Sequence, residues 1–119
     1  MQLVTINKVN ADSYATNLND YCTGLDFPIF QDTITAGAWT QHGANKDDII
    51  VYTKEGILSA FLPNSGSPMT NMGSADGVAN VTAAICHAGG WDDCAEALTN
   101  ECTAAGWTEC LDILEGASY

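Results

Sequence analysis

Four cysteines crowd the last third of this 119-residue chain: Cys86, Cys94, Cys102 and Cys110. Cysteines so placed can form structural disulfides, exchange disulfides with another protein or bind zinc. Zinc sites usually take two ligands from a tight Cys-x2-4-Cys knuckle, and the seven-residue gaps here do not fit that pattern. The spacing therefore favours disulfides and an oxidising compartment, the alternative being a reducing compartment with buried free thiols.

The four cysteines belong to an internal repeat, because residues 86–101 align with residues 102–117. The identical positions are Cys86, Ala88, Gly90, Trp91, Cys94 and Leu98, matched by Cys102, Ala104, Gly106, Trp107, Cys110 and Leu114. Each unit reads as a cysteine, a Gly-Trp turn and a second cysteine at the start of a helix. We expect the two tryptophans to pack over the disulfides or on the preceding domain, the alternative being an exposed ligand platform.

Four cysteines allow three pairings, and helix geometry separates them. If residues 92–103 form one helix, Cys94 and Cys102 lie about 12 Å apart along its axis, at about 1.5 Å per residue. A disulfide needs Cα atoms within about 7 Å, so we favour Cys86–Cys94 and Cys102–Cys110. The fifth cysteine, Cys22, is left over and is expected to be a buried free thiol on its own helix.

Other candidate chemistry is sparse. His42 and His87 are the only histidines, and neither has a nucleophile near it in sequence, so both are interpreted as surface or packing residues. Neither glycine-rich nucleotide-binding motif occurs. We therefore predict no catalytic residue, no metal ligand and no cofactor. Asn80-Val81-Thr82 is a glycosylation sequon, but it falls in a predicted helix and its occupancy stays open.

The charge balance excludes two classes of partner. Fifteen acidic residues face only Lys8, Lys46 and Lys54, without any arginine, which gives a net charge of -12. Such a charge repels nucleic acid and anionic membranes, so neither is expected, and a protein is the class of partner that is left. The acidity is interpreted as a solubility feature, the alternatives being a docking surface or a weak calcium site, although no calcium-loop spacing occurs.

No stretch of the sequence is long and apolar enough to span a bilayer. Residues 1–10 lack the apolar core of a secretory signal, so an exported protein would have had its signal removed or left out of this chain. The cysteine pattern places the protein outside the cell or in another oxidising compartment. Its oligomeric state is not indicated.

The rest of the sequence predicts an α/β order of elements ahead of the repeat. Strands are expected at 2–9 and 27–30, a hairpin at 47–53 and 57–62, and a loop at 63–73. Helices are expected at 13–23, 33–42 and 74–85, the first carrying Tyr14, Leu18, Tyr21 and Cys22 on one face. A mixed sheet with helices on its faces is the natural packing for this order.

Two segments resemble redoxin-type relatives of thioredoxin. Phe27-Pro28-Ile29-Phe30-Gln31-Asp32-Thr33 resembles their strand that ends in aspartate. Lys46-Asp47-Asp48-Ile49-Ile50-Val51-Tyr52, followed by Gly56-Ile57-Leu58, resembles their last hairpin, and its Lys-Asp-Asp run is most similar to the thioredoxin-like domain of selenoprotein P. The resemblance covers roughly residues 2 to 85. It implies a thioredoxin-like domain at 1–85, incomplete at its N-terminal side, and a cysteine-rich helical tail at 86–119.

The chain departs from that family where the chemistry is done. The redox pair, Cys-x-x-Cys or Sec-x-x-Cys, would lie in a strand and helix before Met1, and no Cys-x-x-Cys occurs in this sequence. The family's cis-proline is also missing before Asp47. No catalytic residue can be carried over, and any thiol-disulfide oxidoreductase or peroxidase activity would need the upstream motif. A missing strand would leave an exposed sheet edge beside residues 2–9.

Three explanations fit this departure: a fragment, a relative that lost its active site, or an upstream selenocysteine codon taken as a stop. The leading hypothesis is a protein of thiol-redox lineage without its active site. The alternative, from another class, is a secreted, disulfide-stapled binding or scaffold module that acts through the Cys-Gly-Trp repeats. Disulfide exchange between the repeat cysteines and a partner is a third hypothesis, which the surrounding acidic residues disfavour.

Overall fold

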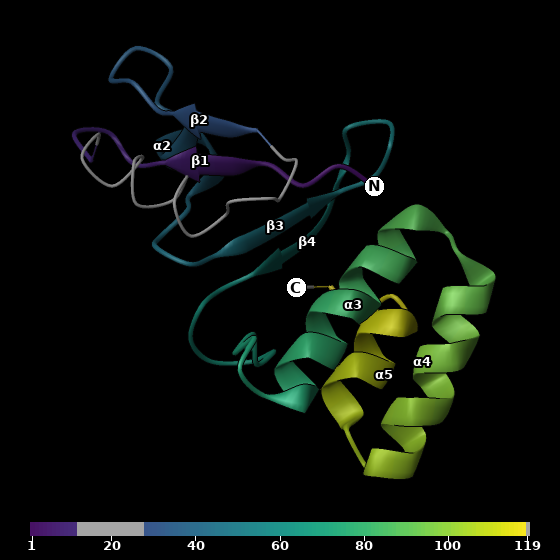
Figure 1. Cartoon of the computed structure of the whole chain (residues 1–119). Helices are drawn as coiled ribbons and strands as arrows, with labels where there is room; N and C mark the ends of the chain where they lie inside the picture. Colours follow the sequence, from purple (N-terminus) through teal and green to yellow (C-terminus); the bar gives the residue numbers. More distant parts are fainter. Residues whose placement is uncertain (12–27, 119) are drawn as a thin grey trace. The chain divides into compact units, whose positions relative to one another are not determined.

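The computed structural model describes residues 1–11 and 28–118, and the chain divides into two compact units, Met1–Ala44 and Asn45–Tyr119. The helix expected at 13–23, with Cys22, lies outside the described residues. In chain order the elements are β1 (Thr5–Asn7), β2 (Ile29–Gln31), α2 (Ala38–His42), β3 (Ile49–Tyr52), β4 (Leu58–Leu62), α3 (Ala75–Gly89), α4 (Asp92–Ala105) and α5 (Thr108–Leu114) (Figure 1).

The first unit is organised by a buried carboxylate directly after β2. Strands β1 and β2 pair in parallel, with Thr5 opposite Ile29. Asp32 then accepts hydrogen bonds from the backbone N–H groups of Thr33 at 2.8 Å, Ala38 at 2.9 Å and Trp39 at 3.1 Å. These bonds hold residues 33–37 in a turn, so α2 begins at Ala38 and not at Thr33 as the sequence predicts.

The edge of β1 that faces away from β2 is covered by a side chain. Because alternate residues of a parallel strand point at the partner strand, the bonds of Thr5 and Asn7 to the β2 segment turn the polar groups of Ile6 the other way. The indole Nε1 of Trp39 donates a hydrogen bond of 2.9 Å to the Ile6 carbonyl. A further strand could pair there only if Trp39 withdrew, which counts against the exposed edge expected beside residues 2–9.

The second unit starts with the predicted hairpin. Strands β3 and β4 are antiparallel, with Ile49 opposite Leu62 and Val51 opposite Ala60. Gly56 closes the turn with a φ of 80°, a value that L-residues with a side chain rarely adopt. One face of the hairpin is apolar and lies on α3, which Figure 1 shows beneath the two strands.

The hairpin and the cysteine repeats share one hydrophobic core. Helices α3, α4 and α5 pack pairwise, and α3 also packs on both strands of the hairpin. The fully buried apolar residues come from β4 and from all three helices: Ala60, Leu62, Ala79, Val81, Ala83, Ala84, Cys86, Leu98, Cys102, Cys110 and Ile113.

The shared core changes the domain organisation that the sequence suggested. The boundary expected between residues 85 and 86 falls inside α3, and the division of the chain lies at residues 44 and 45. The described strands form two separate two-stranded sheets, β1–β2 and β3–β4, where one mixed sheet was expected. A mixed α/β architecture is therefore present, and the segment taken for a tail is half of the second unit's core.

A close backbone approach fixes the start of α3. The Ser74 hydroxyl accepts a hydrogen bond of 3.3 Å from the N–H of Gly77, which is a normal helix cap. A Cβ at Gly77 would lie 2.1 Å from the carbonyl oxygen of Asn71. Only glycine fits there, so the loop before α3 can turn tightly against the first turn of the helix.

Candidate functional site

The two repeats form two helix corners of the same construction. Each helix ends at a glycine in the left-handed region, Gly90 with φ 63° and Gly106 with φ 74°. The tryptophan that follows donates its backbone N–H back to the first cysteine of the repeat, Trp91 to Cys86 at 3.2 Å and Trp107 to Cys102 at 2.9 Å. These bonds satisfy carbonyl groups at the helix end, and the next helix begins directly after each tryptophan.

A disulfide closes each corner. Cys86 pairs with Cys94 across a Cα–Cα distance of 5.7 Å, and Cys102 pairs with Cys110 across 6.5 Å. Both distances lie within the normal range for disulfides. These are the two pairs that the sequence analysis favoured, and each joins the last turn of one helix to the first turn of the next.

The two corners differ in their exposure to solvent. Cys102 and Cys110 are both 0% exposed and lie in the hydrophobic core. Cys86 is 1% exposed, but its partner Cys94 is only partly buried. Cys94 also lines an open depression together with Trp91, Asp92 and Asp93. Solvent can therefore reach the first disulfide from the side of Cys94, whereas the second disulfide is enclosed.

The two tryptophans lie in different environments. Trp91 is 45% exposed, and its ring lies against Gly89, where an added Cβ would come within 2.6 Å of the Trp91 Cε2 atom. In the second repeat Ala105 stands at the position of Gly89, and Trp107 is half-buried against the core. Trp107 thus has the packing role expected of both, while Trp91 stays available to a ligand.

The surface of the helical part is purely acidic in its formal charges. Lys54 is the last lysine or arginine of the chain, so every such charged side chain from α3 to the C-terminus is Asp or Glu. Asp92 and Asp93 lie in the first turn of α4, where carboxylates suit the helix dipole. With Trp91 beside them, they form an aromatic and anionic depression that suits a cation.

Glu109 is a binding residue inside the molecule that the sequence did not reveal. Its carboxylate accepts hydrogen bonds from the Ser67 hydroxyl at 2.5 Å, from the Met69 backbone N–H at 2.8 Å and from the Asn80 Nδ2 at 2.8 Å. The Ser67 bond is the largest cause that lowers the pKa of Glu109, followed by the Met69 bond. Glu109 therefore ties the loop before α3 to α5, while its counterpart Asp93 is exposed.

The sequon asparagine is part of the same network. Asn80 is 1% exposed, and its Nδ2 donates to the Met69 carbonyl at 2.9 Å and to Glu109 at 2.8 Å. A glycan would have to be attached to this nitrogen, both of whose hydrogen atoms are engaged. The sequon at Asn80 is thus a structural element of the fold and is closed to a glycan in the folded state.

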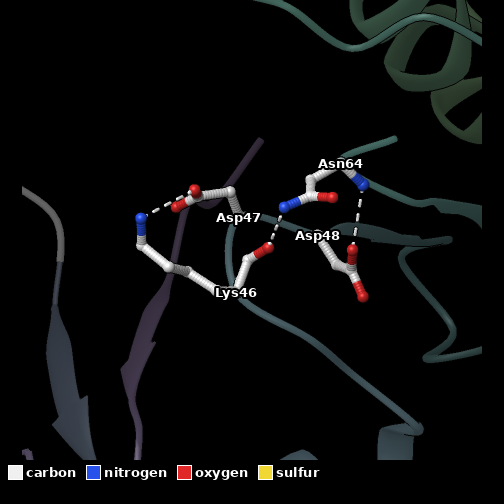
Figure 2. Close-up of polar contacts among 4 residues, drawn as sticks. All are labelled: Lys46, Asp47, Asp48 and Asn64. Carbon is white, nitrogen blue, oxygen red and sulfur yellow. Dashed lines mark hydrogen bonds and ion pairs between the residues drawn. The ribbon is translucent and has the colours of Figure 1, made fainter. Parts of the chain in front are cut away.

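The Lys-Asp-Asp run fixes the start of the hairpin (Figure 2). The Asp48 carboxylate accepts backbone N–H bonds from Asn64 at 2.9 Å and from Asn45 at 2.6 Å. The Asn64 side chain donates to the Lys46 carbonyl at 2.6 Å, and Lys46 forms an exposed ion pair with Asp47 at 3.2 Å. These contacts bind the two ends of the hairpin to each other, and they give this run a structural role.

The remaining candidate residues do not converge. His42 is the last residue of α2 and His87 lies in the last turn of α3, and both side chains are exposed. Within residues 1–11 and 28–118, no group of three His, Cys, Asp or Glu residues is placed to hold a metal ion. Cys22 lies outside the described residues. No described helix is both long and apolar enough to cross a membrane.

No family model, curated protein or solved structure matches this chain.

Proposed function

We propose that residues 45–119 form a disulfide-stapled, acidic binding module for an oxidising compartment, outside the cell or in a secretory or periplasmic space. Its ligand is a basic segment of a partner protein, which it takes up at the corner between α3 and α4. The observation that carries this proposal is the exposure of Trp91 in a depression whose other walls are Asp92, Asp93 and Cys94.

The chemistry of this depression supports a cationic ligand. A lysine or arginine side chain is attracted by the face of an indole ring, and arginine also stacks on it. Asp92 and Asp93 add two carboxylates at the same place, and no basic residue of the helical part competes for them. The net charge of -12 would further speed the approach of a basic partner, an effect that salt screens.

The repeat itself explains why this corner is the binding surface. Trp107, at the equivalent position, packs against the core and cannot face a partner. The enclosed disulfide Cys102–Cys110 holds α4 against α5 beneath it. The second corner thus stabilises the module, and the first corner presents a rigid aromatic group at little cost in entropy.

A titration with a lysine- and arginine-rich peptide tests the proposal, followed by the amide and indole NMR signals. We expect the Trp91 indole and the amides of Asp92 and Asp93 to shift, and the affinity to fall as salt is added. A peptide of reversed charge should not bind. Shifts spread over all acidic residues, without Trp91, would show unspecific attraction and would refute the site.

Matched charge variants separate the site from net charge. Asp92→Asn with Asp93→Asn removes two charges inside the depression, while Glu96→Gln with Glu101→Gln removes two exposed charges elsewhere on α4. Each exposed ion pair contributes about 0.2–1 kcal/mol, so the first variant should bind roughly 2- to 20-fold more weakly. The second variant should lose clearly less, because its carboxylates are outside the depression.

We infer as a second candidate that the chain descends from thiol-redox proteins of the thioredoxin type. The parallel β1–β2 pair followed by the buried Asp32 supports this lineage, and the covered edge of β1 counts against a further strand there. The test is the reading frame upstream of Met1. A strand followed by a stop codon, two residues and a cysteine codon would support a selenocysteine reading, and a frame without it would remove that explanation.

A further inference from the structure

The two disulfides are equivalent in sequence and unequal in access. We propose that Cys86–Cys94 is a thiol–disulfide exchange site, attacked at the Cys94 sulfur by neutral or positively charged thiols, while Cys102–Cys110 stays closed as a structural staple. This inference does not depend on the proposed binding of a basic segment, because it concerns the reaction of the disulfide with any small thiol.

The burial of the four cysteines decides which bond reacts first. Cys102 and Cys110 are 0% exposed, so an attacking thiolate reaches them only after the core has opened. Cys94 is partly exposed and lines the depression beside Trp91. Disulfide exchange requires that the thiolate approach a sulfur atom directly, so access sets the order of the two reactions.

Burial also decides which sulfur is attacked. Cys86 is 1% exposed and lies in the core, and Cys94 is the partner that solvent can reach. An incoming thiolate therefore forms a new S–S bond with the Cys94 sulfur, the Cys86–Cys94 bond breaks, and Cys86 leaves as a thiolate that takes up a proton. A second thiol then attacks the mixed disulfide at its outer sulfur and releases Cys94, so the protein gains two electrons and two thiols form one disulfide.

The charges beside Cys94 select the thiol. Asp92 and Asp93 line the same depression, and no lysine or arginine of the helical part offsets them. A thiol that carries an ammonium group is attracted there, and one that carries a sulfonate or carboxylate group is repelled. Two carboxylates about 7 Å from the attacking thiol, screened by water and salt, would separate the two kinds of thiol about five- to tenfold in rate.

The experiment treats the oxidised wild-type chain with limiting cysteamine, 2-mercaptoethanol or 2-mercaptoethanesulfonate, with rates expressed per thiolate present. Free thiols are alkylated at intervals and the protein is cut by a glutamate-specific protease. Because Glu96, Glu101 and Glu109 are the cutting points, one peptide carries Cys86 and Cys94, and two others carry Cys102 and Cys110 separately. Cys22 falls in another peptide and does not disturb the count.

We expect the peptide with Cys86 and Cys94 to be labelled about tenfold faster than the other two, or more, because burial limits exchange. At the shortest times Cys86 should carry the alkyl group and Cys94 the mixed disulfide. Cysteamine should react faster than the sulfonate. Asp92→Asn with Asp93→Asn should remove most of that preference, and Glu96→Gln with Glu101→Gln should leave it largely in place.

Three results would overturn the proposal. Equal labelling of both disulfides, or earlier labelling of Cys102 and Cys110, would show that access does not set the order. A mixed disulfide on Cys86 would show attack from the buried side. Equal rates for cationic and anionic thiols would show that Asp92 and Asp93 do not act on the approach. A folding defect in either variant leaves the wild-type results, which carry the first two tests, unaffected.

Discussion

Substitution of Glu109 is the sharpest test of what holds the second unit together. Its carboxylate accepts three hydrogen bonds, one of them from the Asn80 Nδ2, whose residue is 1% exposed. Glu109→Ala leaves that buried donor with one acceptor fewer, at about 1–3 kcal/mol. The Ser67 hydroxyl and the Met69 N–H are exposed and can turn to water, so they add little. We expect a loss of about 2–3 kcal/mol in the free energy of unfolding.

Glu109→Gln separates geometry from charge. The two bonds from Met69 and Asn80 both end on the same oxygen, Oε2, and the glutamine carbonyl oxygen can take its place. The glutamine Nε2 can then donate to the Ser67 hydroxyl, which is able to accept. This variant should therefore lose only about 1 kcal/mol, the difference between a charged and a neutral hydrogen bond.

Urea denaturation followed by tryptophan fluorescence measures both variants, with Asp93→Ala as the control. Asp93 is the counterpart of Glu109 in the first repeat, and it is exposed in the first turn of α4. Its removal should change stability by about 0.3–1 kcal/mol through the helix dipole alone. The reasoning is refuted if Glu109→Ala is no more harmful than Asp93→Ala, or if Glu109→Gln is as harmful as Glu109→Ala.

The pH dependence gives an independent check on Glu109. Its hydrogen bonds lower its pKa in the folded state below the value of 4.5 that an unperturbed glutamate has. A group with a lowered folded pKa contributes its stability above the unfolded pKa and loses it as the pH falls through the folded pKa. The stability advantage of the wild type over Glu109→Gln should therefore be full at neutral pH and shrink in acid below about pH 4.5. An advantage that is constant down to pH 3 contradicts this assignment.

Three further predictions concern other contacts. Asp32→Asn should speed amide hydrogen exchange at Trp39, and acid below the ordinary aspartate pKa of 3.8 should do the same to the wild type, because hydrogen bonds from the α2 backbone lower the pKa of Asp32; unchanged exchange in the variant would refute this role. Gly77→Ala should destabilise by about 1–3 kcal/mol in urea unfolding, because its Cβ would meet the Asn71 backbone, whereas an unobstructed helix would gain about 1 kcal/mol from alanine. Folded protein secreted from eukaryotic cells should carry no glycan at Asn80 by intact mass, and a glycosylated, folded fraction would contradict the burial of that side chain.

Local patterns predicted most of the elements correctly, and distant contacts explain the misses. The hairpin and α3 follow from β-branched runs, a glycine turn and an apolar helix face, all of which are local signals. The helix expected from Thr33 begins later because Asp32 binds the N–H groups of Ala38 and Trp39. That carboxylate was visible in the sequence, but nothing near it indicated which backbone groups it would bind.

The domain boundary could not be read from composition. The rise in cysteine content after residue 85 suggested a separate tail, yet α3 runs through this point to Gly89. What joins the two parts is the packing of α3 on the hairpin and on α5, which brings together residues far apart in the chain. A change of composition marks a change of local chemistry, and only the core shows which segments fold together.

The repeat shows how far such a reading extends and where it ends. Matching positions predicted two equal corners, and both disulfides and both glycine turns are indeed alike. The differences between the corners depend on small substitutions whose partners lie elsewhere. Glu109 has one methylene more than Asp93 and reaches the loop before α3, and Gly89 in place of Ala105 gives the Trp91 ring a surface to lie on.

These substitutions divide the work between two corners of the same design. The second corner is committed to stability, because its disulfide, its tryptophan and its acidic residue all face the core or the loop packed on it. The first corner is freed from that task, so its tryptophan, carboxylates and one sulfur face solvent. Its exposure is affordable only because the second corner holds α4 and α5 together. Loss of Cys102–Cys110 should therefore damage the fold more than loss of Cys86–Cys94, although both close loops of the same length.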